Sequence, residues 1–150
     1  MTVHAAIRPS EWELPLFLHV AGAMALVGSL VAVLVIALAA RRGSRDTARL
    51  TRLALRVLLV GVLPSWLVMR VAAQWVVSEA DWGDPGWIGV GYSTSEGGLL
   101  LIIAAIVVAW RATRRRDGAP AGAGTAVLAL TSVLVLAYTV TVWAMTTKPG

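Results

Sequence analysis

The chain has 150 residues, of which 58% are hydrophobic and 14% are charged, with a net charge of +5 and no cysteine. A soluble domain carries about 25% charged residues, so this composition excludes an ordinary soluble protein and indicates one integral membrane domain over residues 1–150, in contact with the lipid bilayer. The lack of cysteine excludes disulfides, thiolate metal sites and cysteine nucleophiles.

Four long apolar segments follow one another along the chain. Each is as long as the roughly 20 residues needed to cross about 30 Å of hydrocarbon. Because a backbone in lipid must satisfy its own hydrogen bonds, these segments are predicted to be helices. The predicted fold class is all-α, an antiparallel up-down bundle of four transmembrane helices. The spans are expected at about residues 14–40, 53–77, 93–112 and 125–145.

The arginines are divided unevenly between the loops. Arginine-rich stretches lie between the first and second spans and between the third and fourth, whereas the loop between the second and third has neither Lys nor Arg. Because basic loops stay in the cytoplasm, the sequence predicts a multi-pass protein of the plasma membrane (the cell inner membrane in a bacterium) with both termini outside. Arginines placed in this way indicate membrane topology rather than nucleic-acid binding.

Small and helix-breaking residues mark two of the spans. In the first span Ala21, Ala25, Gly28 and Ala32 recur at helical spacing and form a small-residue stripe, against which another helix can pack closely. In the second span Pro64 removes one backbone hydrogen bond, so a kink is expected there.

The polar residues within the spans share one depth. The predicted orientation places His19, Arg70 and Glu96 roughly 5–10 Å below the outer surface at 1.5 Å per residue. Gln74 lies one turn from Arg70 on the same helical face, and Tyr138 of the fourth span lies in the same layer. We therefore expect a polar cluster of His19, Arg70, Gln74, Glu96 and Tyr138.

Arg70 and Glu96 are each open to more than one interpretation. Arg70 could snorkel to the outer headgroups, pair with Glu96 inside the bundle, or bind an anionic ligand. Ser93 and Glu96 have the spacing of a capping box, which would place them at the start of the third helix. A capping carboxylate can still accept hydrogen bonds from an arginine.

The two histidines are the candidate metal ligands. His19 either makes one interhelical hydrogen bond or ligates a metal or a haem, with Met69 or Met145 as the second axial ligand. His4 becomes the third residue once Met1 is removed, and an amine, two backbone nitrogens and an imidazole form a square-planar set that suits copper.

Two short motifs carry a resemblance. The sequence Leu18-His19-Val-Ala-Gly22-Ala resembles the opening of the copper-resistance protein D family and of a related group of small bacterial four-helix membrane proteins of unknown function. The closing Trp143-Ala-Met145-Thr-Thr-Lys-Pro is similar to the ends of some members of that group. The tryptophan–glycine that often follows the family's histidine is absent. The resemblance implies involvement with copper or with envelope stress.

Known enzyme templates find no match in the sequence. There is no nucleophile–histidine–acid set, P-loop or dinucleotide fingerprint. We therefore expect a non-enzymatic bundle whose outer polar cluster binds a ligand, a metal or a partner. Three alternatives stay open: an accessory subunit of a larger membrane complex, a copper- or haem-related protein, and a transporter. A transporter of four spans would need a homo-oligomer.

Overall fold

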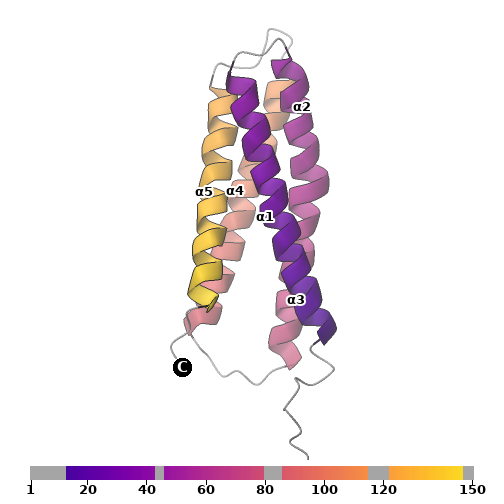
Figure 1. Cartoon of the computed structure of the whole chain (residues 1–150), viewed down its shortest axis with the longest axis vertical. Helices are drawn as coiled ribbons and strands as arrows, with labels where there is room; N and C mark the ends of the chain where they lie inside the picture. Colours follow the sequence, from indigo (N-terminus) through magenta and orange to yellow (C-terminus); the bar gives the residue numbers. More distant parts are fainter. Residues whose placement is uncertain (1–12, 43–45, 80–85, 115–121, 147–150) are drawn as a thin grey trace, which may run out of the picture.

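The computed structural model describes residues 13–42, 46–79, 86–114 and 122–146 (Figure 1). Every element in this part of the chain is a helix, so the all-α prediction is confirmed. Three of the elements, α2, η2 and α3, follow one another without a break and form one helix of 33 residues. The elements are α1 (Glu13–Arg41), α2 (Thr47–Val57), the π-helical turn η2 (Leu58–Val62), α3 (Leu63–Glu79), α4 (Gly86–Arg114) and α5 (Ala123–Thr146).

Four of the described helices are long and apolar enough to cross a membrane, as predicted. They cover Glu13–Arg41, Thr47–Glu79, Gly89–Arg114 and Ala123–Ala144. In each, less than a third of the most apolar window is buried inside the bundle. Large apolar side chains such as Met24, Val60 and Leu100 face outward. Apolar surface on this scale indicates contact with lipid, so the chain is a multi-pass membrane protein.

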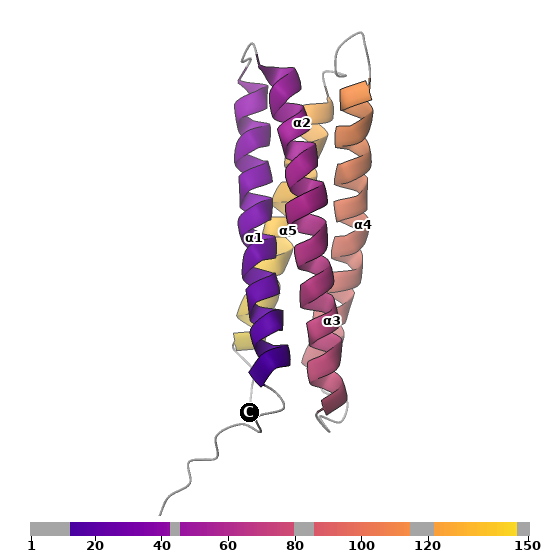
Figure 2. The same cartoon turned by 90° about the vertical axis from the view of Figure 1, so that its right-hand side faces the viewer.

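The helices run alternately up and down (Figures 1 and 2). α1 packs on both neighbouring spans, against α2 and α3 on one side and α5 on the other, and α4 packs on α5 and α2. By contrast, α3 has little contact with α4. We call the end of the bundle where α1 and α4 finish the arginine end, because it carries Arg41, Arg42, Arg49, Arg52, Arg111 and Arg114. The opposite end, where α1 and α4 begin, is the polar end.

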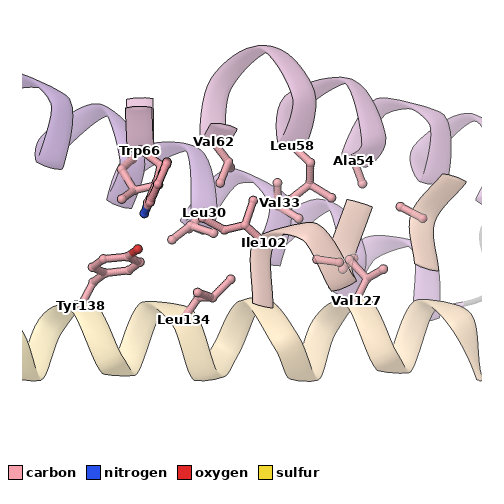
Figure 3. Close-up of a cluster of buried hydrophobic side chains, with 14 of the residues drawn as sticks. Leu30, Val33, Ala54, Leu58, Val62, Trp66, Ile102, Val127, Leu134 and Tyr138 are labelled. Carbon is pink, nitrogen blue, oxygen red and sulfur yellow. The ribbon is translucent and has the colours of Figure 1, made fainter. Parts of the chain in front are cut away.

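The core runs along the bundle and is mainly aliphatic, with Trp66 and Tyr138 at one end (Figure 3). Leu30 of α1, Leu58 of η2, Ile102 of α4 and Leu134 of α5 are fully buried and meet in one cluster. Burying a leucine or isoleucine side chain stabilises a fold by about 1.5–3 kcal/mol relative to water. In a membrane the comparable driving force is close packing, because lipid tails are as apolar as the core.

Two glycines allow close contacts between α1 and the second span. A Cβ added to Gly22 would lie 2.8 Å from the backbone nitrogen of Met69 and 3.0 Å from its Cα, so only glycine lets α1 and α3 touch there. A Cβ added to Gly61 would lie 2.8 Å from the Oγ of Ser29. These contacts fix α1 against the second span at two heights.

The small-residue stripe of α1 faces away from these contacts. Ala25, Gly28 and Ala32 are exposed, and a Cβ added to Gly28 would meet nothing within 4 Å. The glycine that packs within the bundle is Gly22, which lies off the stripe. The stripe is therefore on the outer surface of the single chain.

The proline of the second span follows a π-helical turn. Leu63 donates its backbone N–H to the carbonyl of Leu58, five residues earlier, and Pro64 comes next. A widened turn of this kind accommodates a residue that lacks an N–H. The span continues through Pro64 to Glu79 without interruption.

Candidate functional site

The polar groups of α3 and α4 meet at the polar end of the bundle. α3 carries Arg70 and Gln74, and α4 carries Tyr92 and Glu96; each pair is four residues apart and so shares a helical face. Arg70 Nε and Nη2 donate to Glu96 Oε1 at 3.3 and 3.1 Å. Arg70 Nη1 donates to Gln74 Oε1 at 3.2 Å. The main polar bridge between α3 and α4 is therefore an ion pair with an amide beside it.

Tyr92 completes this network. Its hydroxyl donates to Gln74 Oε1 at 3.0 Å, and the Arg70 guanidinium carbon lies 4.5 Å from the centre of its ring. A cation over an aromatic face is attracted by the ring quadrupole, by about 0.5–1 kcal/mol at an exposed site. Arg70, Gln74, Tyr92 and Glu96 therefore form one connected group, which we call the α3–α4 network.

Glu96 does not lie at a helix start. The capping-box prediction is wrong: α4 begins at Gly86, so Ser93 and Glu96 lie in the third turn of a continuous helix. Their backbone N–H groups already have carbonyl partners within the helix. The carboxylate of Glu96 projects from the helix instead, toward Arg70.

The pair is only partly withdrawn from solvent and lipid. The side chain of Arg70 is 22% exposed and that of Glu96 is 61% exposed. A guanidinium has five N–H donors, and three of those on Arg70 are used. One N–H on each of Nη1 and Nη2 has no partner among the described residues. Arg70 can therefore hold Glu96 and still donate to a further acceptor.

A groove runs along α3 beside this network. Its volume is about 530 Å³, and it is shallow and mostly open, because all of its lining residues come from α3. Here the polar lining comes from Arg70, Gln74 and Ser78, and the apolar lining from Val71 and Trp75.

His19 makes an interhelical hydrogen bond. Its Nδ1 lies 3.1 Å from the carbonyl oxygen of Met69, and the ring is partly buried. This contact is one turn from Gly22, where α1 and α3 touch. His4 lies outside the described residues. Within the described ranges, no group of three or more histidine, aspartate or glutamate side chains could hold a metal ion.

Tyr138 lies in the core of the bundle, opposite Trp66 (Figure 3). It is 6% exposed, and its hydroxyl lies against Gly98, where a Cβ would collide with it. Nearby, Trp66 Nε1 donates to the carbonyl of Ser95 at 3.1 Å. The hydroxyls of Tyr138 and Ser95 are both buried and lack a hydrogen-bond partner in the described structure.

The five residues expected to form one cluster therefore fall into three contacts. Arg70, Gln74 and Glu96 are brought together. His19 joins α1 to α3, and Tyr138 packs between α4 and α5. Sequence reasoning missed Tyr92 because it lay before the expected start of the third span. Its position four residues before Glu96 was the pattern that could have indicated it.

Comparisons with known proteins add no relative. No family model, curated protein or solved structure matches this chain.

Proposed function

We propose that the chain is a non-enzymatic membrane protein that binds an amphiphilic anion, a molecule with a carboxylate or phosphate and an apolar tail, in the groove on α3. One observation carries this proposal. Arg70 borders a groove of about 530 Å³ while keeping two N–H groups without a partner among the described residues.

The groove lining suits both parts of such a ligand. Arginine recognises carboxylate and phosphate through paired N–H groups, and Glu96 and Gln74 hold the guanidinium in a fixed orientation. Val71 and Trp75 are 58% and 42% exposed and offer apolar surface one turn away. Preorganised donors of this kind lower the entropy lost on binding.

The arginine distribution supports an orientation for this site. Basic residues gather at the arginine end, and basic loops stay in the cytoplasm. We therefore place the arginine end in the cytoplasm of a plasma-membrane protein, with the groove and both termini on the outer side. The ligand would then come from the outer leaflet or the extracytoplasmic space.

Side-chain NMR tests the proposal directly. The Arg70 Nε–H resonance, assigned by its disappearance in Arg70→Lys, is followed while hexyl phosphate is added to the detergent-purified protein. Hexanol is the matched probe without the anion. We expect a saturable shift with hexyl phosphate and none with hexanol. A resonance that moves with neither probe, or equally with both, rejects the anion site.

An accessory-subunit role is the second candidate function. The exposed stripe of Ala25, Gly28 and Ala32 supports it, because small residues permit close approach of a helix from another chain. Replacing Gly28 with leucine should then dissociate a homo-oligomer or a complex with another membrane protein. The mass of the native particle, measured by light scattering in detergent, distinguishes this role from ligand binding by a monomer.

The copper- or haem-related alternative has little support beyond the resemblance. The described residues offer no group of three or more histidine, aspartate or glutamate side chains for a metal ion. Because the Nδ1 of His19 is bonded to the Met69 carbonyl, a metal or a haem would have to bind its Nε2. Stoichiometric copper that disappears in His4→Ala or His19→Ala, or a Soret band in the visible spectrum, would restore this alternative.

A further inference from the structure

Three arginines form one face of α2. Arg49, Arg52 and Arg56 are three and four residues apart, so they project from the same side of the helix. All three are exposed, whereas Ala54 and Leu58 on the opposite side are buried in the core. None of the three makes a hydrogen bond or ion pair with another described residue. We call this surface the α2 arginine face.

The length of the second span places this face at the level of the lipid headgroups. The helix from Thr47 to Glu79 has 33 residues, about 50 Å at 1.5 Å per residue, whereas the hydrocarbon core is about 30 Å thick. Arg56 and Trp75 are 19 residues apart, about 28 Å along the helix. If these two residues mark the edges of the hydrocarbon, the turns from Arg49 to Arg56 lie among the headgroups.

Exposed apolar side chains continue from the arginine face toward the membrane centre. Leu53 lies among the arginines and is 44% exposed, and Leu59 and Val60 follow at 44% and 78% exposure. The surface is thus cationic at headgroup level and apolar immediately below. A phospholipid has the complementary division, with a phosphate at one end and acyl chains at the other.

The surrounding charges favour an anionic lipid over a zwitterionic one. Arg41 ends α1 and Arg42 follows it, and Arg111 and Arg114 lie in the last turn of α4, all exposed at the same end. Asp46 is the only acidic residue described at that end. The ammonium group of a zwitterionic lipid would therefore be repelled there, whereas a second negative charge would be attracted.

We propose that the α2 arginine face is a binding site for an anionic phospholipid in the leaflet at the arginine end. Arg49, Arg52 and Arg56 receive the headgroup phosphate, and the acyl chains lie along Leu59 and Val60. The site is separate from the groove on α3 and does not depend on its ligand.

Native mass spectrometry of the detergent-purified protein tests this site. Phosphatidylglycerol and phosphatidylcholine with identical acyl chains are added in equal amounts, and bound lipid is counted. Each arginine near a membrane surface strengthens attraction of anionic lipid about fivefold, so we expect at least about a tenfold preference for phosphatidylglycerol. The triple variant Arg49→Gln/Arg52→Gln/Arg56→Gln should lose that preference.

A second triple variant is the matched control. Arg41→Gln/Arg42→Gln/Arg111→Gln removes the same charge from the same end but leaves the α2 arginine face intact, and it should lower the preference less than the first triple variant does. Equal loss in both variants would indicate diffuse attraction and overturn the proposal.

Three further measurements do not depend on the glutamine variant folding. The lysine variant Arg49→Lys/Arg52→Lys/Arg56→Lys keeps the charge and should keep the preference for phosphatidylglycerol. A wild-type protein that binds both lipids equally rejects the site outright. Arg70→Leu should leave the preference unchanged, which separates this site from the groove on α3.

Discussion

Replacing Arg70 and Glu96 singly and together would measure what their contact contributes to stability. At the 3.1 Å separation of Nη2 and Oε1, the Coulomb attraction is about 1.3 kcal/mol at the permittivity of water and about 5 kcal/mol at an effective value near 20. Because Glu96 is 61% exposed, the water-like limit applies. Ordering two long side chains reduces the gain further, so we expect a coupling energy of about 0.5 to 1 kcal/mol.

The variants are Arg70→Leu, Glu96→Gln and the double variant, unfolded with dodecyl sulfate from mixed micelles and followed by circular dichroism. Arg70→Leu also removes the hydrogen bond to Gln74 and the stacking on Tyr92. Those losses are the same whether residue 96 is glutamate or glutamine, so they cancel in the double-mutant cycle. The cycle therefore gives the coupling energy between Arg70 and Glu96 alone.

A distant pair is the control for this cycle. Thr113 lies near the arginine end of α4, and its hydroxyl bonds to the carbonyl of Trp110. Arg70→Leu and Thr113→Ala should be additive to within about 0.3–0.5 kcal/mol. If Arg70 and Glu96 couple no more strongly than this control pair, the ion pair does not hold α3 to α4 and our account of the network is wrong.

Three other substitutions test the packing in the same unfolding assay. Gly22→Ala should destabilise the bundle by about 1–3 kcal/mol, because its Cβ would force the backbone of Met69 away. Gly28→Ala, which meets nothing, should be neutral or slightly stabilising; equal losses in the two variants would contradict the assigned contact. Tyr138→Phe should stay within about 0.5 kcal/mol of wild type or gain stability, because the hydroxyl has no partner in the described structure. A larger loss would show that this hydroxyl is hydrogen bonded.

Hydropathy alone was sufficient to predict the four helices. Their existence depends on composition averaged over some twenty residues, and such averages tolerate local errors. The start of the third helix was placed too late because Gly89, Gly91 and Ser93 lower the local hydropathy although all lie within α4. Ser93, three residues before Glu96, therefore matched the capping-box pattern although both residues lie within a helix.

The depth of the polar residues was easier to predict than their partners. Depth follows from counting along a helix, and Arg70 indeed lies beside Gln74 and at the height of Glu96. Partners depend on how each helix is rotated about its axis, which the sequence of one chain does not specify. His19 illustrates the difference, since it bonds to a backbone carbonyl of Met69 rather than to a side chain.

The π-helical turn at Leu58–Val62 has a consequence for the whole second span. In a regular α-helix each residue rotates the chain by about 100°. The 12 steps from Ala54 to Trp66 would then amount to three whole turns and about 120° more, so the two side chains would point in different directions. The one surplus residue of a π turn absorbs about 100° of this rotation, so Ala54, Leu58, Val62 and Trp66 are all buried along one side. Ala54, near the arginine end, and Trp66, whose indole bonds to Ser95 of α4, therefore point to the same side of the span. If all 12 of these steps were instead regular α-helix, the additional rotation of about 100° would swing Arg70 out of reach of Glu96.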